Sequence, residues 1–131
     1  MALIQYLLDS NSGIEYIAGS LPTKAVAWLD NIIETEVAIS VINQIEMLGF
    51  SPANPADLLP FEELVATLKV LPLDDGVVME TVVLRKTHKI KLPDAIIAAT
   101  ALVHGLSLIT RNEADFKKIP NLSLINLHNM I

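Results

Sequence analysis

The chain contains no cysteine, which excludes a disulfide framework and a zinc site built on thiolates. The lack of thiols also agrees with a reducing compartment. Residues 1–9 have neither a basic segment nor a long apolar segment, so they do not resemble a signal peptide. No apolar run approaches the roughly 20 residues that cross a membrane. We therefore expect a cytoplasmic protein with no membrane partner.

Glycine is also scarce, and the five glycines are scattered along the chain. No glycine-rich phosphate loop and no Gly-x-Ser-x-Gly nucleophile turn can be formed from them. The three histidines, His88, His104 and His128, do not have the spacing of zinc ligands. These absences leave carboxylates as the main candidates for chemistry.

The size and charge of the chain give the next constraints. With 131 residues, 52% of them hydrophobic, the sequence predicts a single domain, 1–131, with a substantial core. The net charge of −6 is unevenly distributed. Residues 1–84 contain 12 acids and two bases, whereas residues 85–131 contain three acids and seven bases. This asymmetry indicates either a polyanionic partner or a solvated charged face.

Short apolar runs alternate with amphipathic segments throughout the sequence. The runs predict strands at 3–8, 37–40, 69–73, 106–109 and 122–125. The segments between them predict helices at 11–18, 22–33, 41–50, 55–69, 77–89 and 93–104, and a short polar helix or turn at 111–118. Such alternation is typical of an α/β fold with a mainly parallel sheet covered on both faces.

Local signals refine the ends of these helices. We expect Asn11 or Ser12 to cap the helix at 11–18 and Gly19 to end it. Pro60 is a possible break in the helix at 55–69.

Several acids lie at or just after the carboxyl ends of the predicted strands, where parallel sheets bind ligands, and four acids are candidates for chemistry. Asp9 directly follows the first strand, and Asp115 follows the strand at 106–109. Asp94 lies in the first turn of a helix, and Glu46 lies about two turns into the helix at 41–50. Each acid alone also has a structural explanation, because acids cap helices and complement the helix dipole.

Glu46 is flanked by Ile42, Ile45 and Leu48, and a carboxylate among apolar neighbours needs a partner or a metal. Four acids that come together raise one another's pKa values, and a divalent cation removes this repulsion. Mg²⁺ prefers oxygen ligands and promotes the hydrolysis of phosphodiesters.

Four segments in this order, 6–11, 39–46, 92–101 and 108–116, resemble the acidic segments of PIN-domain proteins. The first has the family's strand ending in Asp followed by Ser and Asn, and the third is the best match. The chain resembles in particular the VapC-type toxins of bacterial and archaeal toxin–antitoxin pairs.

This resemblance implies a three-layer α/β/α sandwich and an endoribonuclease that depends on Mg²⁺ or Mn²⁺. It implies four catalytic acids, three of which hold metal: Asp9, Asp94 and Asp115 as metal ligands, with Glu46 as the fourth catalytic acid. It assigns supporting roles to Ser10, Asn11, Thr110 and Asn112. It also implies an RNA substrate, a cognate antitoxin and a homodimer.

Basic residues lie beside two of these acids in the sequence. Arg85, Lys86, Lys89 and Lys91 precede Asp94, while Arg111, Lys117 and Lys118 flank Asp115. We expect these side chains, Arg85, Lys86, Lys89, Lys91 and Arg111 above all, to hold the RNA backbone. The alternatives are a solvated face or a surface for an acidic antitoxin segment.

One feature departs from the family pattern, because Ser12 and Gly13 replace two aliphatic residues. A helical glycine costs roughly 1 kcal/mol relative to alanine, so we expect a looser helix beside Asp9. Because of this departure, a PIN-like module that binds RNA or protein without cutting remains an alternative function. A phospho-acceptor receiver domain is disfavoured, since Ser10 and Asn126 lie where that class needs an acid and a lysine.

Overall fold

The structure is a computed structural model that describes residues 3–131. Five strands form one sheet in the order β3-β2-β1-β4-β5, and every neighbouring pair is parallel. The strands are β1 (Tyr6–Leu8), β2 (Val37–Ser40), β3 (Lys69–Leu71), β4 (Ser107–Ile109) and β5 (Leu124–Ile125). This arrangement confirms the predicted α/β fold with a parallel central sheet.

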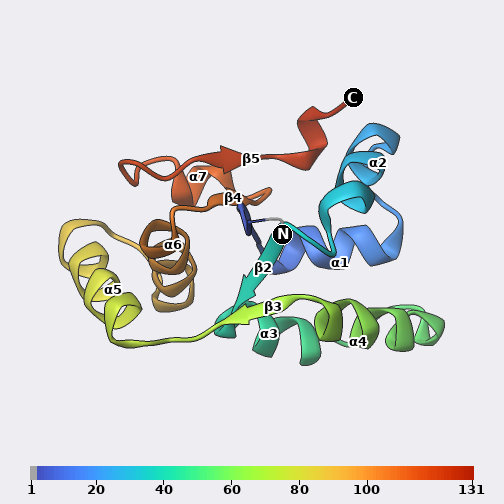
Figure 1. The fold of residues 1–131 in the computed structure, drawn as a ribbon, viewed down its shortest axis with the longest axis horizontal. Coiled ribbons are helices and arrows are strands. Elements are labelled where there is room, and N and C mark those ends of the chain that lie inside the picture. The colour runs from blue at the N-terminus through green and yellow to red at the C-terminus, as the bar shows by residue number, and fades with distance from the viewer. Residues whose placement is uncertain (1–2) are drawn as a thin grey trace.

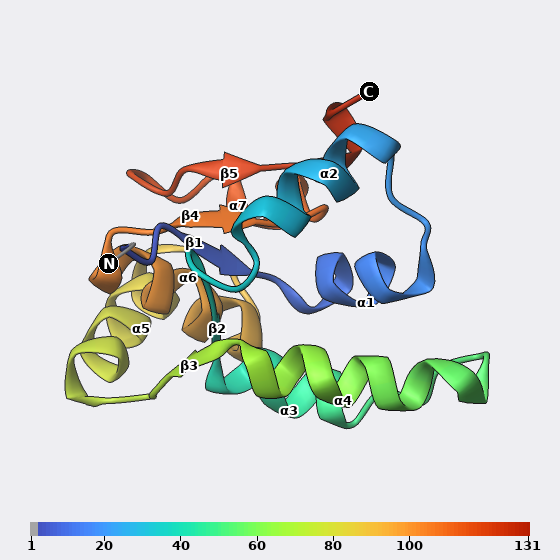
Figure 2. The same ribbon diagram turned by 45° about the vertical axis from the view of Figure 1, so that its right-hand side comes forward.

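Helices cover both faces of this sheet (Figures 1 and 2). They are α1 (Ser10–Ala18), α2 (Thr23–Ile32), α3 (Val41–Leu48), α4 (Leu58–Thr67), α5 (Asp75–Thr87), α6 (Leu92–His104) and α7 (Glu113–Phe116), with 3₁₀ turns η1 (Pro55–Asp57) and η2 (Leu127–Asn129). Helices α5 and α6 lie on one side, and α1, α2 and α4 lie on the other. No helix within residues 3–131 has the length and hydropathy to span a membrane.

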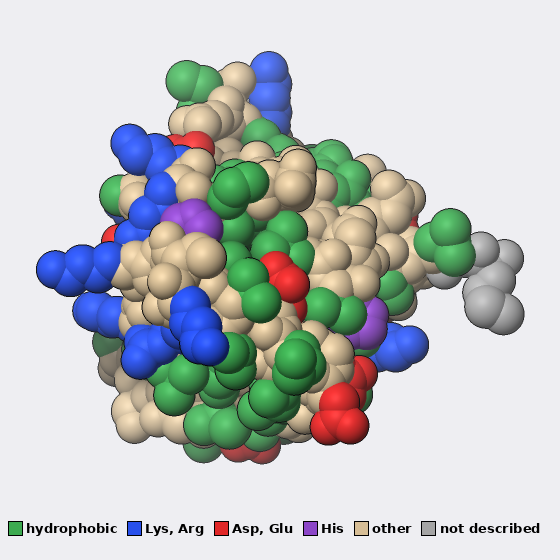
Figure 3. All heavy atoms as spheres, turned by 90° about the vertical axis from the view of Figure 1, so that its left-hand side faces the viewer, with side chains coloured by type: hydrophobic (Ala, Val, Ile, Leu, Met, Phe, Trp, Pro, Cys, Tyr) green, Lys and Arg blue, Asp and Glu red, His purple; other side chains and the backbone are tan. Residues whose placement is uncertain are grey.

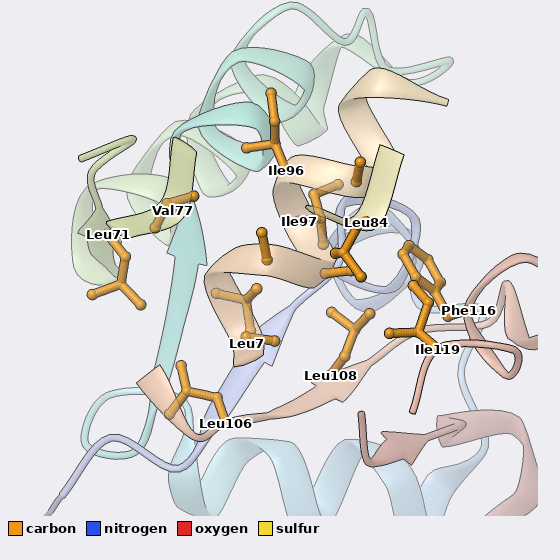
Figure 4. Close-up of a cluster of buried hydrophobic side chains, with 14 of the residues drawn as sticks. Leu7, Leu71, Val77, Leu84, Ile96, Ile97, Leu106, Leu108, Phe116 and Ile119 are labelled. Carbon is orange, nitrogen blue, oxygen red and sulfur yellow. The ribbon is translucent and has the colours of Figure 1, made fainter. Parts of the chain in front are cut away.

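The two sides have separate hydrophobic cores because successive strand residues point to opposite faces. Leu7 and Leu108 pack under α5 and α6, as Figure 4 shows. Their neighbours Leu8 and Ile109 pack in the core that α2 and α4 complete. The layers are therefore helix, sheet and helix, and the predicted three-layer sandwich is confirmed.

Most predicted elements exist, with shorter strands than the apolar runs suggested. The run 3–8 forms a strand only from Tyr6 to Leu8, whereas Val37–Ser40 is a strand over its whole predicted length. Pro60 does not break α4, because it lies in the first turn, where a helix does not need the missing amide hydrogen. The predicted helix at 55–69 is instead divided into η1 and α4.

Helix α1 begins one residue earlier than predicted, and its cap is Asp9 rather than Asn11 or Ser12. Asp9 has extended backbone angles, and its side chain accepts a hydrogen bond from the Ser10 amide. Gly19 ends the helix in the left-handed conformation that glycine favours, as predicted. The helix therefore starts directly at the end of β1, and the capping side chain lies at the carboxyl ends of the strands.

Gly13 allows α1 to pack closely against α3. A Cβ atom at this position would lie 2.7 Å from Cε of the buried Met47. The helix continues through Gly13 without interruption. Gly13 thus lies in an unbroken helix and serves a tight contact between two helices, while the expected loosening of α1 stays a prediction.

We expect Gly13→Val to destabilise the protein by about 1–3 kcal/mol, the usual cost of overpacking a core. Gly13→Ala should be nearly neutral, since alanine gains about 1 kcal/mol of helix propensity while the Met47 side chain moves aside. Urea unfolding of both variants measures these changes. A valine variant as stable as the wild type would show that α1 and α3 are not closely packed here.

Candidate active site

The candidate site lies where β1 and β4 run side by side. In the sheet, β2 and β3 lie on one side of β1, whereas β4 and β5 lie on the other. The segments that follow β1 and β4 therefore diverge and leave a crevice at the carboxyl edge of the sheet. Leu8 pairs with Ile109, which brings the next residues, Asp9 and Thr110, together at this edge. Ligands of open α/β sheets bind at such a switch point.

Asp9 is buried, with 7% of its surface exposed, and three groups hold its carboxylate. Oδ1 accepts hydrogen bonds from the Ser10 amide at 2.9 Å and from Asn43 Nδ2 at 3.3 Å. Oδ2 accepts one from Thr110 Oγ1 at 2.8 Å. The carboxylate is thus fixed from α1, α3 and the end of β4.

Burial raises the pKa of Asp9 above its usual value of 3.8. The hydrogen bonds from Thr110 and the Ser10 amide act in the opposite direction, and the nearby charge of Glu46 adds to the increase. The charged form is therefore disfavoured on balance, and a cation bound nearby would restore it.

Asn43 is a site residue that we did not predict. It is fully buried on α3, and its Oδ1 accepts hydrogen bonds from the Ser40 amide and hydroxyl. Its Nδ2 donates to Ser10 Oγ at 3.0 Å as well as to Asp9. The signal in the sequence is the pair Ser40 and Asn43, three residues apart at the start of a helix, which is the spacing of a capping box.

Glu46 is exposed, so the expectation of a carboxylate among apolar neighbours is wrong. Ile45 and Leu48 are 62% and 53% exposed, because α3 buries the face that carries Asn43 and Met47. Glu46 nevertheless belongs to the site, since its Oε1 accepts a hydrogen bond from Ser10 Oγ at 2.8 Å.

Asp115 joins the same network through Asn112. Asn112 Nδ2 donates to Asp115 Oδ2 at 2.8 Å, and the Asn112 amide donates to Thr110 Oγ1 at 3.0 Å. Since Thr110 also binds Asp9, a continuous chain of hydrogen bonds links three carboxylates: Asp115, Asn112, Thr110, Asp9, Asn43, Ser10 and Glu46 in that order. Asn11, in contrast, is exposed on α1 and lies outside this chain.

Asp94 faces the other three acids from the first turn of α6. Burial raises its pKa most, followed by the charges of Asp9, Asp115 and Glu46, while Lys91 lowers it. Within residues 3–131, no three acids or histidines lie close enough together to hold one ion between them. Because Mg²⁺ keeps several waters and usually binds one or two carboxylates, this set of oxygen donors still fits the ion.

A cleft of about 350 Å³ opens beside Asp94 and Asp115. Its lining consists of Arg85, Lys89, Ile90, Lys91, Asp94, Asp115 and Lys118. Lys86 does not line this cleft, and neither does Arg111, which pairs with Glu15 at 3.0 Å. Figure 3 shows that Lys and Arg side chains gather along one edge of the face formed by α5 and α6.

Comparisons with known proteins agree with this geometry. A family model described as PIN domain matches residues 6–122. The chain therefore belongs to the PIN-domain family, which confirms the resemblance inferred from its four acidic segments. Toxin FitB of Neisseria gonorrhoeae is 32% identical over 124 residues, which cover 84% of this chain and 89% of that protein.

Solved structures extend the similarity over nearly the whole chain. A toxin–antitoxin complex from Klebsiella pneumoniae is 31% identical, with a TM-score of 0.72 over 93% of this chain and 97% of that chain. DNA-bound VapBC from Salmonella typhimurium is 26% identical, with a TM-score of 0.77 and the same coverage of 93% and 97%.

Thr110→Val should lower the free energy of unfolding by about 1–3 kcal/mol, since it removes the hydrogen-bond partner of Oδ2 of the buried Asp9 and that of the Asn112 amide. Thr100→Val is the matched control, because the buried Thr100 hydroxyl bonds only to the Ile96 carbonyl of its own helix. Urea unfolding of both variants measures the difference. Equal losses would show that the contact with Asp9 adds nothing to stability.

Asp94→Asn should stabilise the metal-free protein at neutral pH. The raised pKa means that folded Asp94 binds its proton more tightly than unfolded Asp94 does, so stability falls as pH rises from 3.8 through the folded pKa. Asparagine carries no charge and avoids this loss. Thermal melting with a chelator should give a higher Tm for the variant near pH 7 and similar Tm values near about pH 3. A lower Tm at neutral pH would show that burial and the neighbouring acids do not disfavour the charged form of Asp94.

Proposed function

We propose that the protein is a metal-dependent endoribonuclease and the toxin of a VapBC-type toxin–antitoxin pair. The observation that supports this most is the hydrogen-bonded chain that holds Asp9, Glu46 and Asp115 at the carboxyl edge of the sheet, with Asp94 facing them. An array of fixed carboxylates beside a basic cleft suits the hydrolysis of a polyanion.

Mg²⁺ or Mn²⁺ is the cofactor that this donor set would take, with waters and one or two of the carboxylates Asp9, Asp94 and Asp115 holding each ion. Burial, and to a lesser extent the charges of neighbouring acids, raise the pKa values of Asp9 and Asp94, and a bound cation would offset both effects, which supports a cationic partner. When bound, the cation supplies a Lewis acid for the phosphate oxygens and makes a water molecule more acidic.

The buried and the exposed side chains of the site have different roles in the proposed reaction. Thr110 and Asn43 hold the buried Asp9 in one orientation, which is the fixed placement of charge that electrostatic catalysis needs. Glu46 is the exposed acid of the four, and only one of its oxygens accepts the bond from Ser10. We assign Glu46 the contact with the attacking water, whose proton its other oxygen, Oε2, can accept.

The similar proteins support the biological role. One relative is named as a toxin, and the Klebsiella pneumoniae structure is a toxin–antitoxin complex. We propose that this chain likewise has a protein antitoxin as partner, forms a homodimer and acts on RNA in the cytoplasm.

Expression of the chain in a bacterial host should arrest growth and produce discrete RNA fragments, and Asp94→Asn should abolish both effects. Asp75→Asn is the matched control, because Asp75 is also an acid in a first helical turn but lies on α5, away from the site. Growth curves and gels of total RNA are the measurements.

Fragments that persist in Asp94→Asn at the wild-type level would overturn the assignment of this site. Normal growth and intact RNA with the wild-type chain would favour the second candidate, a PIN module that binds RNA or protein without cutting.

A further inference from the structure

A general attraction for RNA requires only positive charge on the surface. The basic cleft beside Asp94 has, in addition, a defined volume and side chains that are held in place. We propose that it binds the phosphate of a single nucleotide next to the cleaved bond and does so without regard to the base. This proposal rests on the proposed nuclease function and adds to it a defined subsite with its own residues.

The charges around the cleft favour an anion. Four cations, Arg85, Lys89, Lys91 and Lys118, line it together with two carboxylates, Asp94 and Asp115. The cations exceed the carboxylates by two, although the chain as a whole has a net charge of −6. A phosphate that enters here therefore meets a local excess of positive charge in an acidic protein.

Two of these cations are held in place by backbone carbonyls. Arg85 Nη1 donates to the Ile90 carbonyl at 2.7 Å, and Lys118 Nζ donates to the Lys89 carbonyl. These contacts tie the end of α5 and the segment after α7 to the loop that leads into α6. A guanidinium has five donors and an ammonium three, so both groups keep free donors for a phosphate.

The size of the cleft and its lining limit what can be recognised. A volume of about 350 Å³ is at the lower end of small-molecule sites, roughly 300–1,000 Å³, and suits one nucleotide. Ile90 is the only uncharged side chain of the lining, which includes no aromatic ring. Proteins that hold single-stranded bases stack them on aromatic rings, so this cleft has charge for the phosphate and no platform for the base.

The other basic residues provide matched controls. Lys86 lies three residues from Lys89, and Lys117 is next to Lys118, but neither lines the cleft. All four lysines are exposed, so their substitution should leave the core intact. Comparing Lys118→Gln with Lys117→Gln, and Lys89→Gln with Lys86→Gln, separates the cleft from the general field of positive charge.

The test is titration of the whole chain, with a chelator present, with AMP, CMP, GMP, UMP and the four nucleosides, followed by NMR. We expect the four nucleotides to bind with Kd values within about threefold of one another and the nucleosides not to bind. Lys118→Gln and Lys89→Gln should each raise Kd about tenfold, the loss of one hydrogen bond to a charged group. Lys117→Gln and Lys86→Gln should change it by less than about twofold.

Three results would overturn the proposal: no nucleotide binding, equal effects of all four lysine variants, or a preference for one base of more than about tenfold. RNA cleavage is measured separately with the same variants. Cleavage without the expected binding pattern would reject the subsite alone. The expected pattern in a chain that never cleaves RNA would keep the subsite and reject the nuclease function.

Discussion

The structure of the site depends on one buried carboxylate. Asp9 lies at the edge of the sheet between β1 and β4, where burial opposes its charge. The groups that stabilise it come from different elements: the start of α1, Asn43 on α3 and Thr110 after β4. Because a buried carboxylate is costly without these partners, its position fixes the relative placement of all three elements. The same hydrogen bonds therefore stabilise the buried charge and fix the positions of the three elements.

Packing between α1 and α3 connects the buried Asp9 with the surface of the protein. The close approach that Gly13 allows at Met47 brings Ser10 within hydrogen-bonding distance of both Asn43 and Glu46. An exposed carboxylate is thereby connected to a buried one through two short polar side chains. A glycine that reduces helix propensity is thus compatible with a continuous helix at the site, where the absence of a side chain allows the close contact with Met47.

The charge distribution is compatible with the proposed action of an acidic protein on a polyanion. The carboxylates converge at the carboxyl edge of the sheet, while four cations line the adjacent cleft. The remaining basic residues have other environments, as Arg111 shows by pairing with Glu15. Under the proposed function, substrate phosphates and the acids repel one another, so the cleft and the proposed cation together would determine whether RNA can approach the acids.

The sequence alone determined the order of strands and helices, because apolar periodicity and local capping signals act over a few residues. It also predicted the four candidate acids, since Asp9, Asp94 and Asp115 follow or begin elements whose ends meet at one edge of a parallel sheet and Glu46 lies in a segment that resembles the PIN-domain family. Only the tertiary structure decided which face of α3 is buried, and this exposed Glu46 and made Asn43 a partner of Asp9. It likewise separated Lys118, in the cleft, from Lys86 and Arg111, outside it. The physical reason is that hydrogen bonds such as those of Asp9 with Asn43 and Thr110, 34 and 101 positions away, depend on packing that no local pattern contains.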